Sequence, residues 1–150
     1  MDGFERAAIV GAGTMGRGIA RLLAGQGVAV SLCDRDEALA EAGRATLAED
    51  VRSAVRRGEL PADEAARMLA RVRSAADLAA AVDGAELVVE AIPEVLEAKR
   101  EVWQRLAGCA GGEAVLTTKT GAGVYQWPAE AARAALSQRD ERLRSREAAD

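Results

Sequence analysis

The sequence contains no histidine, and this absence limits its chemistry more than any other feature of its composition. A mechanism that needs an imidazole as general base or as metal ligand is excluded for this polypeptide alone. Only two cysteines are present, and their spacing matches neither a disulfide framework nor a metal site. We therefore expect reduced thiols in a cytoplasmic protein without a metal centre, with Cys33 in the core and Cys109 at a helix end.

Aromatic residues and long apolar runs are also scarce. Aromatic residues make up 3% of the 150 residues, so the core has to be built from Val, Leu, Ile and Ala. No run approaches the roughly 18 apolar residues of a membrane helix, and the N-terminal M-D-G-F-E-R lacks the pattern of a signal peptide. The net charge of −4 argues against a nucleic-acid partner. These features predict a soluble domain with no membrane segment.

Glycines in the spacing G-x-G-x-x-G are the feature around which the chain is organised. They follow the apolar run 7–10 and precede a helical pattern. A strand that turns sharply into a helix leaves the first N–H groups of that helix directed at one place, where the helix dipole also favours an anion. Glycines at this turn allow a phosphate to come close. The motif predicts a dinucleotide site at Gly11, Ala12, Gly13, Thr14, Met15 and Gly16.

An acidic residue follows the second expected strand, 28–33. The carboxylate of Asp34 can accept hydrogen bonds from both ribose hydroxyls of the adenosine half, and it would repel a 2′-phosphate. This favours NAD over NADP, although the neighbouring Arg35 weakens the preference because an arginine can pair with a phosphate. A glycine-rich turn with a purely structural role is the alternative.

Strand patterns and helix patterns alternate along the chain. We expect strands at 6–10, 28–33, 72–74, 86–92 and 114–118, and helices at 14–26, 36–57, 61–71, 77–82 and 94–107. This order predicts an α/β fold, a Rossmann-type doubly wound parallel sheet with a helical arm after the second strand. A glycine-rich turn at 119–128 and a charged C-terminal helix at 129–146 complete the expected elements.

Two glutamates flank Pro93 at the carboxyl end of the expected strand 86–92. Ligands of open parallel sheets bind beyond the carboxyl ends of the strands, so Glu90 and Glu94 are candidates for a site. Acidic residues are equally typical of an exposed helix start, and the sequence leaves both interpretations open. By composition alone, Lys99 is expected to be a surface lysine.

Three segments resemble the NAD-binding half of the 3-hydroxyacyl-CoA dehydrogenases. They are G-A-G-T-M-G-R-G-I-A, L-C-D-R-D and E-L-V-V-E-A-I-P-E-V-L-E-A-K-R-E-V, and the resemblance covers about 6–118. It implies that the glycines hold the pyrophosphate of NAD and that Asp34 holds the adenine ribose. It also implies that Glu94 and Lys99 line the nicotinamide side, and that the helical arm helps to hold coenzyme A. The implied cofactor-binding set further includes Arg35, Ala91 and Ile92.

The chain departs from this family after the strand 114–118. Where the family has an Asn-Thr-Ser-Ser segment, this chain has Lys119 in place of the asparagine and Gly121 in place of the first serine. The family's later segment with the catalytic histidine, its partner glutamate and a helical domain have no counterpart here, while K-T-G-A-G-V-Y-Q-W-P resembles the far carboxyl end of the family. We therefore expect an internal deletion near 118–120, natural or engineered. The expected domains are 1–118, binding NAD, and 119–150, a remnant of the C-terminal helical domain.

The family reaction is the NAD-dependent oxidation of 3-hydroxyacyl-CoA to 3-oxoacyl-CoA, a step of fatty acid metabolism. We expect this chain to bind NAD, with acyl-CoA as a possible second ligand, and to have weak or no activity alone, because the base of the family is a histidine and this chain has none. It could be a subunit completed by a partner, a non-catalytic NAD-binding or sensing module, or a truncated relic. An uncovered apolar strand at 114–118 would also favour a homo-oligomer.

Overall fold

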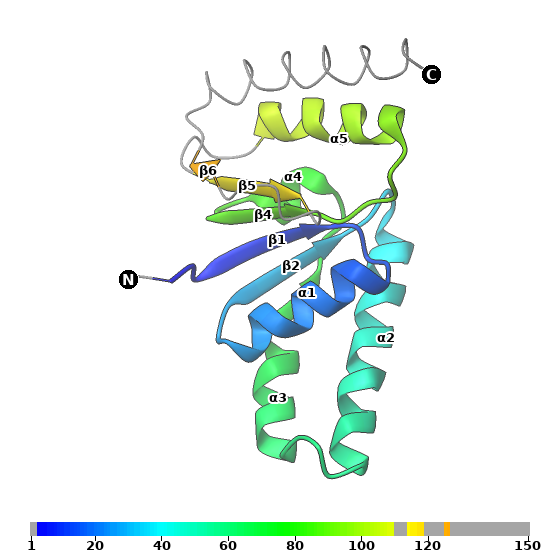
Figure 1. The fold of residues 1–150 in the computed structure, drawn as a ribbon, viewed down its shortest axis with the longest axis vertical. Coiled ribbons are helices and arrows are strands. Elements are labelled where there is room, and N and C mark those ends of the chain that lie inside the picture. The colour runs from blue at the N-terminus through cyan, green and yellow to red at the C-terminus, as the bar shows by residue number, and fades with distance from the viewer. Residues whose placement is uncertain (1–2, 110–113, 119–124, 127–150) are drawn as a thin grey trace.

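A computed structural model describes residues 3–109, 114–118 and 125–126 (Figure 1). The described residues form one sheet with the strand order β3-β2-β1-β4-β5-β6. The parallel strands are β1 (Arg6–Val10), β2 (Ala29–Cys33), β3 (Val72–Ser74), β4 (Leu87–Glu90) and β5 (Val115–Thr118). Their order reverses between β1 and β4, which confirms the doubly wound α/β fold.

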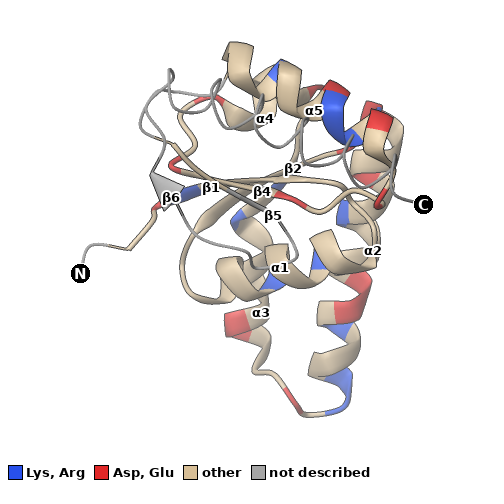
Figure 2. Cartoon of the chain, turned by 45° about the horizontal axis from the view of Figure 1, so that its top comes forward, with Lys and Arg blue, Asp and Glu red and all other residues tan. Residues whose placement is uncertain are grey.

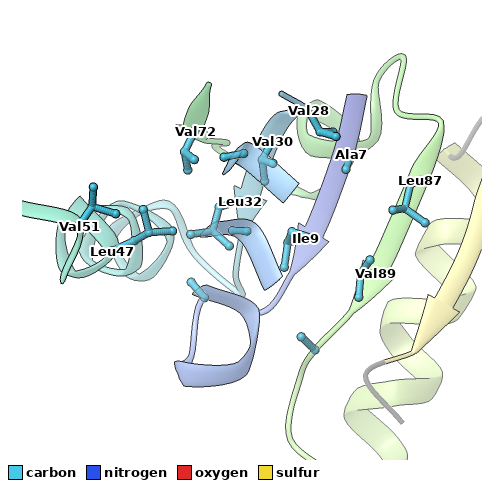
Figure 3. Packing of buried hydrophobic residues seen from close by; sticks show 14 of the residues in the cluster. Ala7, Ile9, Val28, Val30, Leu32, Leu47, Val51, Val72, Leu87 and Val89 are labelled. Atoms are coloured by element: carbon cyan, nitrogen blue, oxygen red, sulfur yellow. The ribbon is translucent and has the colours of Figure 1, made fainter. Parts of the chain in front are cut away.

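The central strands are almost continuously apolar because helices cover the sheet on both faces. In β1, Ile9 pairs with Leu32 of β2 on one side and with Val89 of β4 on the other. Successive side chains of β1 enter different cores: Ile9 belongs to one buried cluster, and Ala8 and Val10 belong to the second. Figure 3 shows the first of these clusters, in which Leu47 and Val51 of the second helix approach Leu32.

In the described part of the chain, five helices cover the two faces of the sheet. They are α1 (Thr14–Gly25), α2 (Glu37–Arg56), α3 (Ala62–Ala70), α4 (Leu78–Val82) and α5 (Leu96–Cys109). Buried residues of α1, α2 and α3 belong to the cluster of Figure 3, whereas those of α4 and α5, such as Leu78 and Trp103, belong to the opposite cluster. The loop between β1 and α1 therefore lies where one covering layer begins, at the carboxyl edge of the sheet.

The predicted helical arm is confirmed as the helix pair α2 and α3, which extends beyond the sheet (Figure 1). Asp36 caps α2 by accepting a hydrogen bond from the Leu39 N–H at 2.9 Å, and Pro61 precedes the first turn of α3. Gly58, with a φ of +73°, ends the first helix of the arm. Arginine and acidic positions are interspersed along this arm (Figure 2).

The segment after β4 differs from the prediction. The strand ends at Glu90 rather than at residue 92, and α5 begins at Leu96 rather than at residue 94. The Ile92 N–H donates to the Glu90 carboxylate at 2.8 Å, and Pro93 has no N–H to donate. The strand pairing therefore stops early, and a short loop separates β4 from α5.

The expectation of an uncovered strand edge at β5 is not met at two residues. A two-residue strand, β6 (Tyr125–Gln126), lies antiparallel to it and pairs with Val115 and Leu116. Tyr125 and Gln126 were expected to belong to the glycine-rich turn 119–128. The expected C-terminal helix at 129–146 lies outside the described residues. Within the described part of the chain, none of the helices combines the length and apolar character needed to cross a membrane.

Candidate dinucleotide-binding site

Three loops meet at the carboxyl edge of the sheet where the strand order reverses. The Gly11 N–H, directly after β1, donates to the Cys33 carbonyl of β2 at 2.8 Å. On the other side, the Ala91 N–H after β4 donates to the Val10 carbonyl at 2.8 Å. The loop after β1 is thus held from both sides, at the position where open α/β sheets bind their ligands.

The three glycines of the loop after β1 have different structural roles. Gly11 has a φ of +113°, and a Cβ atom there would lie 2.7 Å from the Ala91 carbonyl oxygen. A Cβ atom on Gly16 would collide with the Gly11 carbonyl oxygen. Gly13 is exposed, and a Cβ atom there would meet no atom within 4 Å. Gly11 and Gly16 therefore allow the loop to pack tightly, while Gly13 leaves the open side over which a phosphate group fits.

The first turn of α1 is free to receive an anion. Gly13 is its N-cap residue and provides no side-chain hydrogen bond, and the first turn contains no acidic residue. Thr14 and Met15 are exposed there, and Met15 keeps 55% of its surface accessible. The helix dipole and the first N–H groups therefore favour negative charge at this end. This arrangement suits the pyrophosphate of a dinucleotide.

The acidic residue after β2 lies against the glycine loop. One carboxylate oxygen of Asp34 accepts from the Ala12 N–H at 2.7 Å, and the other accepts from the Arg35 N–H at 2.8 Å. Each oxygen retains a second lone pair that can accept from a ribose hydroxyl. Asp34 is half-buried and the side chain of Arg35 is exposed. The donor and acceptor set therefore fits an adenosine ribose beside the phosphate loop.

Two further residues fix this loop, and the sequence pattern did not identify them. A Cβ atom on Gly43 of α2 would lie 2.5 Å from the Ala12 Cβ atom and 2.8 Å from its carbonyl oxygen. Arg17 of α1 donates to the same carbonyl oxygen at 3.2 Å. A glycine inside a helix costs about 1 kcal/mol relative to alanine, so Gly43, within the expected helix 36–57, was a sequence signal of a close approach.

A group of ionic side chains lies on the β4 side of the reversal. The Lys99 ammonium lies 2.8 Å from a carboxylate oxygen of Glu90 and 3.0 Å from one of Glu94. Glu90 has no exposed surface and Lys99 is only 5% exposed. The expectation of a surface lysine is therefore wrong, and Glu90 is not part of a solvated helix start. Removing two charges from water is costly, and the close pairing offsets that cost.

The two cysteines have no catalytic environment. Burial, and secondarily the charge of Asp34, raises the pKa of Cys33 to about 12. Burial also raises the pKa of Cys109, whose thiol donates to the Arg105 carbonyl. Both thiols are therefore protonated near neutral pH and are poor nucleophiles. Among the described residues, no group of histidine, cysteine or acidic side chains is arranged to hold a metal ion.

The structure places the predicted cofactor-binding residues in two groups. Those after β1 and β2 surround the phosphate loop: Gly11, Ala12, Gly13, Thr14, Met15, Gly16, Asp34 and Arg35. Those after β4 lie in the loop to α5 or on that helix: Ala91, Ile92, Glu94 and Lys99. The two groups are joined at the contact of Gly11 with Ala91. Their contacts with a cofactor stay a prediction.

Comparison with known proteins gives a consistent result. Residues 6–133 match the family model described as 3-hydroxyacyl-CoA dehydrogenase, NAD binding domain. The chain is 37% identical over 121 residues to 3-hydroxyadipyl-CoA dehydrogenase of Escherichia coli, covering 80% of this chain and 25% of that protein. It is 34% identical over 105 residues to 3-hydroxybutyryl-CoA dehydrogenase of Mycobacterium tuberculosis, covering 70% of this chain and 36% of the relative.

A solved structure of 3-hydroxybutyryl-CoA dehydrogenase from Escherichia coli superimposes with a TM-score of 0.72 at 30% identity. The superposition covers 83% of this chain and 28% of that one. The chain thus spans between a quarter and just over a third of the length of these curated relatives. The family match includes the glycine loop, Asp34 and the loop after β4. The chain belongs to the 3-hydroxyacyl-CoA dehydrogenase family and contains its NAD-binding domain.

Proposed function

We propose that this chain holds NAD across the reversal between β1 and β4 and serves as the cofactor-binding part of a 3-hydroxyacyl-CoA dehydrogenase. The proposal rests on the conformation of the glycine-rich loop 11–16, the phosphate loop. Gly11 and Gly16 pack against backbone atoms, Gly13 faces open space, and the Asp34 carboxylate is already bonded to Ala12. A pyrophosphate and an adenine ribose would meet preorganised partners there.

We propose further that the chain alone has little or no dehydrogenase turnover. Oxidation of a 3-hydroxyacyl-CoA by hydride transfer requires a base to take the hydroxyl proton. The family uses a histidine, and this sequence has none. The residues of the described site hold and orient the cofactor. Three alternatives follow: a partner subunit or segment supplies the base, the chain only senses NAD, or the chain is a relic left by an internal deletion near 118–120. Activity and partner measurements distinguish them.

The test begins with calorimetric titration of NAD and NADP, followed by acetoacetyl-CoA-dependent NADH oxidation on the same sample. We expect NAD to bind more tightly than NADP and no oxidation above background. Failure to bind NAD would refute the cofactor proposal, and measurable turnover by the chain alone would refute the claim that the absent histidine is decisive. Turnover that appears only after a partner is added would identify the completed enzyme.

A pair of variants makes the cofactor test specific. Asp34→Asn removes the negative charge beside the phosphate loop, and its amide oxygen can still accept from Ala12. Asp36→Asn removes the same charge nearby and retains the cap of α2, because asparagine caps helices as well as aspartate does. We expect Asp34→Asn to lower NAD affinity about ten-fold and to reduce discrimination against NADP, because hydrogen bonds to a charged group contribute about 1.5–3 kcal/mol. Asp36→Asn should leave both affinities unchanged.

The remaining proposals concern a second ligand, the cellular location and the oligomeric state of the chain. We propose acyl-CoA as a second ligand because the family relatives act on CoA substrates. The two free cysteines support a reducing, cytoplasmic location. A homodimer or larger species stays a proposal, although its original basis is weaker because β6 pairs with two residues of the β5 edge. Sedimentation as a clean monomer would refute it.

A further inference from the structure

The geometry points to Arg17 as a positioning residue for the pyrophosphate of the dinucleotide. Its guanidinium holds the peptide between Ala12 and Gly13 so that the Gly13 N–H faces the bound phosphate, and its positive charge polarises that N–H. The inference rests on the proposed function, because it concerns the same phosphate loop. It assigns a role to a charged side chain that follows the last glycine of the motif and is not one of the motif's own residues.

A cation is unexpected at the position of Arg17. Arg17 is the fourth residue of α1, which begins at Thr14. The helix dipole places partial positive charge at this end, so a cation there is unfavourable unless negative charge lies nearby. The first turn of α1 contains no acidic residue, and within the described part of the chain no carboxylate forms an ion pair with Arg17. A full and a partial positive charge therefore lie side by side at the phosphate loop.

The guanidinium of Arg17 is only partly satisfied. One of its terminal nitrogens donates to the Ala12 carbonyl at 3.2 Å. Its Nε atom is enclosed and forms no hydrogen bond within the described residues. Taking a cation out of water in this way costs free energy. An anion bound at the adjacent loop offsets that cost, because opposite charges attract more strongly in a partly enclosed place than in water.

The contact with Ala12 fixes the orientation of one peptide unit. The Ala12 carbonyl points into the junction of α1 and α2, since a Cβ atom on Gly43 of α2 would lie 2.8 Å from its oxygen. In a trans peptide, the C=O and the following N–H point in opposite directions. The Gly13 N–H is therefore directed away from that junction, and Gly13 is exposed. A charged donor on the carbonyl polarises the peptide and makes its N–H a stronger donor to a phosphate.

The preceding peptide unit is held independently of Arg17. The Ala12 N–H donates to the Asp34 carboxylate at 2.7 Å, and the Gly11 N–H donates to the Cys33 carbonyl at 2.8 Å. Loss of the guanidinium would release the peptide that faces the phosphate and leave the Asp34 contact in place. Binding of the pyrophosphate and binding of the adenosine should therefore respond differently, whereas a purely structural role of Arg17 would change stability without separating the two.

The test measures dissociation constants of the full chain for NAD⁺, ADP-ribose and adenosine. Arg17→Met removes the charge and the hydrogen bond, and Arg21→Met makes the same change one turn further along α1 as the matched control. We expect Arg17→Met to bind NAD⁺ and ADP-ribose about ten-fold more weakly, the equivalent of one hydrogen bond to a charged group. Adenosine affinity should not change, since adenosine has no phosphate. Arg21→Met should leave all three affinities unchanged.

Two further substitutions at Arg17 make the test independent of folding. Arg17→Lys keeps the charge and can still donate to the Ala12 carbonyl, so it should recover most of the NAD⁺ affinity that Arg17→Met loses. If urea denaturation shows that Arg17→Met does not fold, Arg17→Gln takes its place, because its amide can satisfy the carbonyl without a charge. We expect Arg17→Gln to bind NAD⁺ and ADP-ribose about three-fold more weakly, since a neutral donor contributes about half as much as a charged one.

Four outcomes would overturn the inference while NAD binding itself stands. They are unchanged NAD⁺ affinity in the folded Arg17→Met or Arg17→Gln variant, an equal loss for adenosine, an equal loss in Arg21→Met, and a loss in Arg17→Lys as large as that in Arg17→Met. A loss shared with adenosine would indicate a general distortion of the site. Failure of the unmodified chain to bind either NAD⁺ or ADP-ribose would overturn the proposed function together with the inference.

Discussion

Replacing Gly43 by alanine tests whether α2 has to lie directly against the phosphate loop. A Cβ atom at this position would come within 2.5 Å of the Ala12 Cβ atom and 2.8 Å of its carbonyl oxygen. Neither atom can rotate away, because one is a backbone atom and the other is attached directly to the backbone. The substitution would therefore displace either the helix or the loop that the pyrophosphate is proposed to contact.

The matched control is Gly18→Ala, which makes the same change inside α1. A Cβ atom on Gly18 would meet no atom within 4 Å. Alanine gains about 1 kcal/mol over glycine in a helix interior, and both variants share this gain. Overpacking costs typically about 1–3 kcal/mol, and only Gly43→Ala incurs that cost. We therefore expect Gly43→Ala to be about 1–3 kcal/mol less stable than Gly18→Ala.

Urea denaturation gives the free energies of unfolding, and calorimetric titration gives the NAD affinity. For a chain of this size, the expected stability difference corresponds to roughly 2–4 °C in melting temperature per kcal/mol. Gly43→Ala should also weaken NAD binding, because Ala12 and its neighbours would move. If Gly43→Ala proves as stable as Gly18→Ala and binds NAD like the unmodified chain, the close contact between α2 and the loop is not needed and the reasoning is refuted.

Three other predictions follow from the ionisable groups. Lys99→Met should destabilise the fold by about 3–5 kcal/mol in urea denaturation, because the enclosed Glu90 carboxylate loses its partner, and adding Glu90→Leu should recover much of this loss. The hydrogen bond from Arg44 is the main cause that lowers the pKa of Glu41 to about 2 from 4.5. The stability advantage over Glu41→Gln should therefore be fully present above pH 4.5, decrease as the pH falls toward 2, and be reduced by salt. In a Cys109→Ser background, a thiol reagent at pH 8 should label Cys33 only on unfolding, whereas rapid labelling of the folded chain would contradict its burial and raised pKa.

The features that sequence alone could predict are those set by local pattern. The strand 6–10, the glycine turn and Asp34 lie close together in the chain, and one strand-turn-helix unit determines their arrangement. The cap at Asp36 and the start of α3 after Pro61 are likewise decided by neighbouring residues. The doubly wound parallel sheet was predicted because strands and helices alternate along the chain, whereas its strand order came from the structure.

The features that could not be predicted depend on contacts between distant segments. Lys99 has the local sequence of a surface residue, and only the position of α5 against the end of β4 places its ammonium beside Glu90. The early end of β4 has a similar cause, since the Glu90 side chain takes the Ile92 N–H that a longer strand would use. β6 was missed because a two-residue strand carries no periodic pattern of its own.

Ala12 contacts three parts of the adenosine side of the site: the residue after β2, helix α1 and helix α2. Its N–H donates to Asp34 after β2, its carbonyl accepts from Arg17 of α1, and its side chain lies against Gly43 of α2. The carboxylate proposed to bind ribose therefore also orders the loop proposed to bind pyrophosphate. Truncation to Asp34→Ala would leave the Ala12 N–H without its partner and combine both losses, so the affinity change would overstate the ribose contact. Asp34→Asn keeps an acceptor for that N–H, so the difference between the two variants measures how much NAD binding depends on the ordered loop.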